Sequence, residues 1–122
     1  MNNIILIGYG YWGNNLLRNI CSVFEQKNVF VHDLSSESLT LAKKNFPKIN
    51  IQTSITSKFL RENIDAAVIA TPVSTHYEIA KKCLENHVNV LVEKPITTSV
   101  TQLDSLNEIA LKNKLIMMSG HT

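Results

Sequence analysis

The sequence predicts an α/β fold: a doubly wound sheet of six parallel strands with helices on both faces. Two observations support this class. Six short apolar runs recur along the 122 residues, with amphipathic stretches between them. Several of the runs are apolar at consecutive positions, as in parallel strands that are buried on both faces. A β-α repeat of this kind gives right-handed crossovers, and six strands are enough for the order 3-2-1-4-5-6.

The predicted strands are the six apolar runs, at residues 4–7, 29–31, 49–51, 66–70, 88–92 and 115–118. The predicted helices rest on apolar residues that recur on one helical face. These sets are Leu16, Leu17, Ile20, Cys21 and Phe24; Leu39, Leu41, Ala42 and Phe46; Ile79, Ala80, Cys83 and Leu84; and Leu103, Leu106 and Ala110.

The sequence also indicates where some helices begin and end. Residues 75–78 (T-H-Y-E) and 99–102 (S-V-T-Q) have the pattern of a capping box. In such a box the first and fourth side chains satisfy each other's free backbone N–H groups, so we expect helices to begin there. Asn86 and Asn113 stand where helices are expected to stop.

Composition favours one compact domain without a nucleic-acid or membrane partner. The chain is 44% hydrophobic with a net charge of +2, and its lysines are scattered. The apolar run at 4–7 is too short for a signal peptide or a spanning helix. Cys21 and Cys83 each fall in an apolar helical register, so we expect neither a metal site nor a disulfide, and a cytoplasmic location.

The segment "ILIGYGYWGNN" runs from the first strand through three glycines into a helix. Gly8 permits a tight turn, Gly10 lets a backbone approach a pyrophosphate, and Gly13 lets the helix pack against the strand. The helix from about Gly13 directs free N–H groups and its positive dipole end at the anion, so no lysine is needed. This pattern predicts a Rossmann fold that binds a dinucleotide; the alternative is a glycine-rich turn without a ligand.

Asp33 follows the second strand, twenty residues after Gly13. An acid there can accept hydrogen bonds from both ribose hydroxyls of an adenosine. A carboxylate repels a 2′-phosphate, and no lysine or arginine follows until Lys43, so we favour NAD over NADP. The alternative role for Asp33 is a helix N-cap together with Ser35 and Ser36.

Three aromatic residues, Tyr9, Tyr11 and Trp12, lie between the glycines. They either pack against the connections of the fifth and sixth strands or lie beside the nicotinamide end of the cofactor. The sequence leaves both interpretations open.

Residues 67–99 resemble the glucose-fructose oxidoreductase, inositol dehydrogenase and MocA family of NAD(P)-dependent sugar dehydrogenases. The matching motifs are "ATP" at 70–72 followed by "TH" at 75–76, "EKP" at 93–95, and the glycine turn. The resemblance covers the whole chain. The ending "MMSGHT" and the segment "GYGYWGNNLLRN" resemble the branch that oxidises nucleotide-linked amino sugars and their uronates, the UDP-N-acetyl-hexosaminuronate 3-dehydrogenases.

In this family a substrate domain of equal or greater size follows the cofactor domain. We therefore expect residues 1–122 to be one dinucleotide-binding domain that lacks the family's C-terminal substrate domain. Such a chain would bind NAD(H) and turn over a sugar or nucleotide sugar poorly or not at all. Apolar surface left without its partner domain would favour self-association into a homo-oligomer.

The resemblance implies that Lys94 is catalytic. It would take a proton from a sugar hydroxyl while the adjacent carbon gives its hydride to the nicotinamide ring. Partial burial beside the positive ring disfavours the ammonium form, which suits a base. The alternative is a solvated lysine at a strand end. Glu93 would either orient Lys94 or close a helix end, and in both cases lies at the cofactor site.

The resemblance also assigns Thr71, Pro72 and His76 to the cofactor site. Thr71 and Pro72 would line the middle of the cofactor, and they also suit a strand-to-helix turn. His76 matches the family's histidine, with a surface helix residue as the alternative. His121 is expected to face the missing domain, and His87 to lie in an exposed loop.

Two other classes share parts of this pattern. A non-catalytic NAD(H)-sensing regulatory module carries the same glycine turn and acid, but has no reason for the "EKP" motif. An S-adenosylmethionine methyltransferase has a glycine loop and an acidic second strand, but its sheet needs an antiparallel hairpin strand for which this sequence has no candidate.

Overall fold

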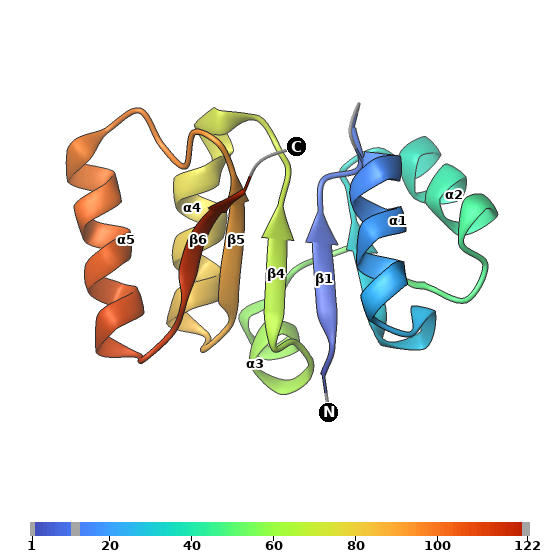
Figure 1. The fold of residues 1–122 in the computed structure, drawn as a ribbon, viewed down its shortest axis with the longest axis horizontal. Coiled ribbons are helices and arrows are strands. Elements are labelled where there is room, and N and C mark those ends of the chain that lie inside the picture. The colour runs from blue at the N-terminus through green and yellow to red at the C-terminus, as the bar shows by residue number, and fades with distance from the viewer. Residues whose placement is uncertain (1, 11–12, 121–122) are drawn as a thin grey trace.

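The structure, a computed structural model, describes residues 2–10 and 13–120. Its six strands form one parallel sheet in the order β3-β2-β1-β4-β5-β6, as predicted. The strands are β1 (Ile4–Ile7), β2 (Val29–His32), β3 (Asn50–Ile51), β4 (Ala66–Ile69), β5 (Asn89–Glu93) and β6 (Met117–Gly120). Figure 1 shows the sheet with β1 and β4 at its centre and helices on both sides of it.

Five α-helices connect the strands. They are α1 (Gly13–Val23), α2 (Ser36–Asn45), α3 (Ser57–Asn63), α4 (Val73–Glu85) and α5 (Val100–Lys112), and a 3₁₀ turn at Gln26–Asn28 precedes β2. Helix α3 was not among the predicted helices. Thr56 caps it by accepting a hydrogen bond from Phe59 N at 3.0 Å, and within the helix only Leu60 is fully buried. One buried position gives no periodicity, so the sequence pattern does not predict this helix.

Strand β1 separates two hydrophobic clusters. Ile5 and Ile7 face α3, α4 and α5, where they pack in a cluster that contains Leu84. Ile4 and Leu6 face α1 and α2 in a second cluster. All four side chains of β1 are buried, each worth about 1.5–3 kcal/mol relative to exposure. The consecutive apolar pattern therefore reflects helices on both faces, as predicted.

One of the two predicted capping boxes is wrong. Helix α4 begins at Val73, directly after Pro72, and not at the predicted Thr75. Proline suits the position before a helix because its backbone is already fixed. The hydroxyl of Thr75 instead lies 2.6 Å from both Thr71 Oγ1 and Pro72 O, inside the first turn.

In the second capping box, Thr97 stands between the two predicted partners, Gln102 and the backbone N–H of Ser99. Ser99 caps α5 by accepting from Gln102 N at 3.2 Å. Gln102 does not reach back to Ser99 N; its Oε1 accepts from Thr97 Oγ1 at 2.7 Å, and Thr97 Oγ1 accepts from Ser99 N at 3.2 Å. Asn86 and Asn113 end α4 and α5 as predicted.

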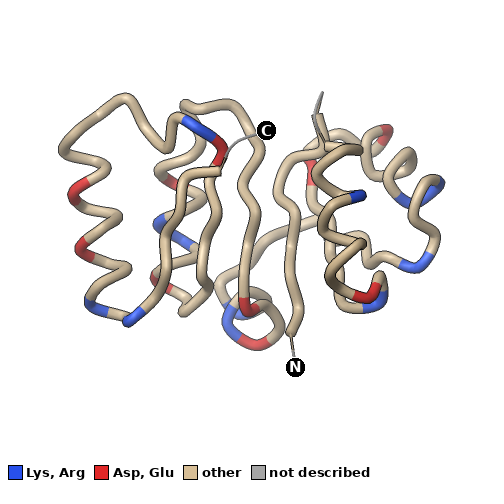
Figure 2. The backbone as a smooth tube through the Cα atoms, viewed as in Figure 1, with Lys and Arg blue, Asp and Glu red and all other residues tan. Residues whose placement is uncertain are grey.

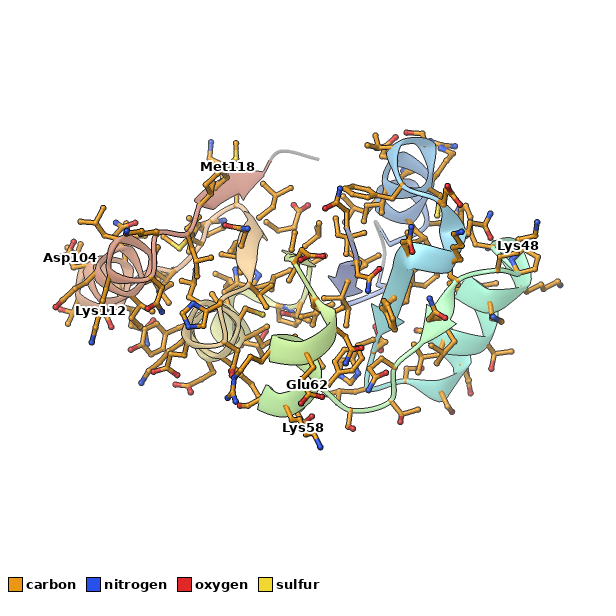
Figure 3. All side chains as sticks on the ribbon, turned by 90° about the horizontal axis from the view of Figure 1, so that it is seen from below. Lys48, Lys58, Glu62, Asp104, Lys112 and Met118 are labelled. Atoms are coloured by element: carbon orange, nitrogen blue, oxygen red, sulfur yellow. The ribbon has the colours of Figure 1, made fainter. Side chains whose placement is uncertain are left out.

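Charged side chains are spread over the helices and loops, as Figure 2 shows, with positive and negative positions interspersed. Lys48, Lys58 and Lys112 point outward in Figure 3. Within the described ranges, no helix is long and apolar enough to cross a membrane. Over the same residues, no three or more His, Cys, Asp or Glu side chains are grouped to hold a metal ion.

Candidate functional site

A cavity of about 530 Å³ opens at the carboxyl ends of β1, β2 and β4. This is the switch point of the sheet, since the chain leaves β1 toward β2 on one side and returns to β4 on the other. Its volume lies within the range of small-molecule sites. Its lining residues are Ile7, Gly8, Gly10, His32, Asp33, Leu34, Ile55, Leu60, Ala70, Thr71, Pro72, Thr75, Ile79, Lys82 and Cys83.

The glycine turn forms one wall of this cavity. Gly8 has φ +102°, and a Cβ there would lie 2.8 Å from the carbonyl oxygen of Ala70, so both conformation and space require glycine. Among the described residues other than its chain neighbours, a Cβ on Gly10 would meet no atom within 4 Å. That side of Gly10 is therefore open toward these residues, as the approach of a pyrophosphate would need.

Gly13 serves a different contact from the one predicted. A Cβ at Gly13 would lie 2.9 Å from the ring of Tyr9, which is buried with 4% exposure. The Tyr9 hydroxyl donates to Asn14 Oδ1 at 2.8 Å. Gly13 thus makes room for an aromatic ring at the start of α1, and not for direct contact between helix and strand. Neither interpretation offered for Tyr9 anticipated this position. Tyr11 and Trp12 lie outside the described residues.

Asp33 connects the glycine turn to the loop after β2. Its Oδ2 accepts from Tyr9 N at 2.7 Å and its Oδ1 accepts from Ser35 N at 2.8 Å. Ser35, not Asp33, is the N-cap of α2, because Ser35 Oγ accepts from Ser38 N at 3.2 Å. The N-cap alternative for Asp33 is therefore wrong. Each carboxylate oxygen keeps a further lone pair for a hydroxyl donor.

The loop after β4 forms the opposite wall. Thr71 and Pro72 line the cavity, and Thr71 Cγ2 lies 3.0 Å from the Cβ position of Gly8. Lys82 of α4 is the single lysine or arginine among the residues that line it. Leu34 is 98% exposed at the rim.

Cys83 contributes a buried thiol to the floor of the cavity. Burial raises the pKa of Cys83 to about 12, with a smaller opposing effect of the positive charge of Lys82. Burial also raises the pKa of Cys21, which is less deeply placed. Both cysteines are free. The thiol of Cys83 therefore behaves as a small apolar group, not as a nucleophile.

Glu93 and Lys94 lie at the same edge of the sheet as the cavity. Glu93 is the last residue of β5 and is half-buried, and the exposed Lys94 follows it. The peptide bond between Lys94 and Pro95 is cis. Strand β5 pairs with β4 so that Val92 is level with Ile69. Lys94 therefore stands one strand further from β1 than Thr71, beside the cavity and not in its lining.

His76 does not lie on the helix surface. It is 2% exposed, and both ring nitrogens face backbone carbonyl oxygens. It is not among the lining residues of the cavity. This placement could not be predicted from the sequence, because a histidine in a first helical turn is ordinarily solvated and the partners of His76 lie five to twenty residues away.

A glycine turn, an acid after the neighbouring strand and an open cavity at the switch point define a dinucleotide-binding domain. Residues 2–121 match the family model described as an oxidoreductase family with an NAD-binding Rossmann fold, and the chain belongs to this GFO/IDH/MocA family. The family predicted from the motifs is confirmed, and with it a nicotinamide cofactor.

Two curated relatives match nearly the whole chain. The 2,7-anhydro-N-acetylneuraminate hydratase of Mediterraneibacter gnavus is 30% identical over 95% of this chain and 30% of its own length. Inositol 2-dehydrogenase 2 of Paenarthrobacter aurescens is 31% identical over 94% of this chain and 34% of its own. The chain thus spans about a third of the length of the curated relatives it matches.

A solved structure supports the same assignment. UDP-N-acetylglucosamine 3-dehydrogenase of Acidithiobacillus ferrooxidans superposes with a TM-score of 0.84 and 25% identity, over 98% of this chain and 38% of that one. Dehydrogenases named for a cyclic polyol and for a nucleotide sugar are therefore both among the relatives.

Proposed function

We propose that these residues are the cofactor-binding domain of an NAD(H)-dependent dehydrogenase that acts on a sugar or nucleotide sugar. The observation that carries the proposal is the open space beside Gly10, with the Asp33 carboxylate across the same cavity. A pyrophosphate fits beside a bare backbone at the start of α1, and a ribose fits against an acid.

The chain's own groups favour NAD over NADP. Asp33 lines the cavity, and residues 34–42 contain no lysine or arginine. A 2′-phosphate on the adenosine ribose would face the Asp33 carboxylate without a cation from this loop to offset the repulsion. The free lone pairs of Asp33 would accept from the two ribose hydroxyls of NAD instead.

When bound, the nicotinamide would accept or give up a hydride. The roles proposed for Lys94 and Glu93 follow from their place at the end of β5, at the edge where the cavity opens. Lys94 would take the proton from a substrate hydroxyl, and Glu93 would orient the Lys94 side chain. Thr71 and Pro72 would contact the middle of the cofactor, where they line the cavity.

The substrate class follows from the relatives. Their names include an inositol dehydrogenase and a UDP-N-acetylglucosamine 3-dehydrogenase, so the proposed hydride donor is a ring carbon that bears a hydroxyl in a sugar or nucleotide sugar. Hydride transfer needs the substrate carbon within about 3–3.5 Å of the ring in an aligned pose. The 122 residues alone would bind NAD(H) with little or no turnover. We also propose that they self-associate through exposed apolar surface, and that they act in the cytoplasm.

Isothermal titration calorimetry with NADH tests the proposal. The unaltered chain is expected to bind NADH, and Asp33→Asn to bind it about tenfold more weakly. In the variant a side-chain N–H would face the backbone N–H of Tyr9 or Ser35, and the ribose would lose a charged acceptor. Asp104→Asn is the matched control, since Asp104 lies on the outer side of α5 (Figure 3) and is not among the residues that line the cavity. Equal affinity of the two variants would contradict the assigned site.

A further inference from the structure

The imidazole of His76 joins the two loops that flank the cofactor cavity. Its Nε2 lies 2.7 Å from Thr71 O, in the loop after β4. Its Nδ1 lies 3.0 Å from Pro95 O and 3.1 Å from Ile96 O, in the loop after β5. All three partners are carbonyl oxygens, which only accept, so a ring nitrogen forms a hydrogen bond here when it carries the proton; a neutral ring has one N–H, and the contact with the loop after β5 is donated when that N–H is on Nδ1.

These contacts are in the protein interior, where hydrogen bonds are costly to lose. The ring is 2% exposed. Strand β5 ends at Glu93, so the carbonyls of Pro95 and Ile96 lie beyond its hydrogen-bonded ladder to β4. Without a donor from the His76 side chain, these two carbonyls would lack a hydrogen-bond partner where they face the buried ring.

The ring lies between a residue beside the glycine turn and the residue that follows Lys94. On one side His76 holds Thr71, whose Cγ2 packs 3.0 Å from the Cβ position of Gly8. On the other side it holds Pro95, the residue directly after Lys94. One buried side chain therefore contacts both the loop beside the proposed pyrophosphate turn and the loop that follows the proposed catalytic lysine.

We propose that His76 is a positioning residue, which holds Lys94 beside the nicotinamide through its Nδ1 contact with the loop after β5. The inference rests on the proposed function, since it requires NADH to bind and Lys94 to lie near the bound ring. It assigns His76 no contact with the cofactor, in contrast to the role implied by the family resemblance.

Two variants separate the two halves of this contact. His76→Asn places its amide nitrogen near the position of Nδ1 and keeps a donor for Pro95 O and Ile96 O. His76→Gln places its amide nitrogen near the position of Nε2 and keeps a donor for Thr71 O. The two side chains have the same chemistry, so they differ mainly in which loop is held.

The readout is the rate at which an amine-reactive acetylating reagent modifies Lys94, followed by peptide mass spectrometry with and without saturating NADH. Lys58 and Lys112 serve as internal references, since both point outward on α3 and α5 (Figure 3). Leu106→Ala controls for lost stability, because Leu106 is fully buried in α5 and lies outside the cavity lining.

In the unaltered chain, NADH is expected to slow the acetylation of Lys94 and to leave the two reference lysines unchanged. His76→Asn and Leu106→Ala should keep this protection. His76→Gln should lower it about fivefold, as expected for the loss of one buried hydrogen bond.

The outcomes separate the two proposals. If NADH does not bind the unaltered chain, or binds without protecting Lys94, the proposed function fails. If NADH protects Lys94 equally in the unaltered chain and in both His76 variants, the positioning role is wrong and the proposed function stands. Failure of both His76 variants to fold would also overturn the positioning role, because His76 would then serve the fold as a whole.

Discussion

The three glycines of the first turn have three separate physical reasons. Gly8 is required by its positive φ and by the carbonyl of Ala70, Gly10 faces empty space, and Gly13 faces the ring of Tyr9. Of the three, Gly10 is the position where an added Cβ would meet no atom of the described residues beyond its chain neighbours. At the scale of single residues, we therefore predict that the size of the residue at Gly10 matters to ligand binding and not to the fold.

Gly10→Val tests this distinction. The free energy of unfolding is expected to change by less than about 0.5 kcal/mol, as at other uncrowded surface positions, while NADH affinity falls about tenfold or more because the side chain fills the space of the pyrophosphate. Urea denaturation and calorimetry measure the two quantities. Gly13→Val is the contrasting variant, because its side chain would meet the Tyr9 ring and should lower the free energy of unfolding. A Gly10 variant that keeps full NADH affinity would place the pyrophosphate elsewhere.

Cofactor preference is also set by single residues. In the double variant Asp33→Ser with Leu34→Arg, the carboxylate is gone and a guanidinium stands at an exposed rim position. We expect the ratio of NADPH to NADH affinity to rise about tenfold or more, since an arginine can pair with the 2′-phosphate. Fluorescence titration with each reduced cofactor measures the ratio. An unchanged ratio would mean that the ribose does not lie at Asp33.

At the scale of elements, α4 brings together the floor of the cavity and the core. Its buried residues include Cys83, which lines the cavity, and His76, which joins the two loops. The raised pKa of Cys83, on this helix, makes the free energy of unfolding depend on pH. The folded state keeps the thiol protonated up to about pH 12, whereas the unfolded thiol ionises from about pH 9. The unfolded state therefore binds fewer protons in this range, and stability falls as pH rises.

Between pH 8 and pH 10 this thiol should reduce the free energy of unfolding by about 1.4 kcal/mol. Cys83→Ala removes the titrating group, so the variant should show a smaller fall over the same range than the unaltered chain. Urea denaturation at the two pH values gives the comparison, in which lysines and tyrosines common to both proteins cancel. Identical pH slopes would show that burial does not hold the thiol protonated.

The elements that were predictable are those whose contacts are local or periodic. β1 was predicted from four consecutive apolar residues, and the strand order followed from the repeat of strands and helices. Helix α3 was missed because seven residues with one buried leucine carry no period. The capping box at Thr75 was misplaced because Pro72 already fixes the start of α4.

The site residues also fall into a group that the sequence predicts and a group that it does not. That Gly8, Gly10 and Asp33 lie at one site was predictable from their residue types at a fixed spacing, and all three line the cavity. Their contacts with a pyrophosphate and a ribose stay predictions. The contacts of Tyr9 with Gly13 and of His76 with Pro95 depend on how the chain packs in three dimensions. No local pattern encodes such contacts, so they became visible only in the structure.

At the scale of the whole molecule, the two halves of the sheet are covered differently. Figure 1 shows β4, β5 and β6 facing the viewer without a helix in front of them. Met118 of β6 is 57% exposed and points outward on the α1 side of the sheet (Figure 3), and Ile116 just before the strand is 61% exposed. Exposed apolar side chains on a sheet face favour association.

We therefore expect the 122 residues to self-associate as concentration rises, and the double variant Ile116→Lys with Met118→Lys to stay monomeric. Sedimentation velocity over a range of concentrations measures this. Leu111→Lys is the matched control, because Leu111 is also exposed but lies on α5. A chain that is monomeric at every concentration, or a control that disperses it equally well, would rule out this face.

The most direct test of the central claim is an NMR titration of the ¹⁵N-labelled chain with NADH. The amides of Gly10, Leu34 and Thr71 should shift together and saturate with one dissociation constant, while the amide of Lys112, at the far end of α5, stays unchanged. Absence of any shift at millimolar NADH, or shifts confined to residues outside the cavity, would contradict the account.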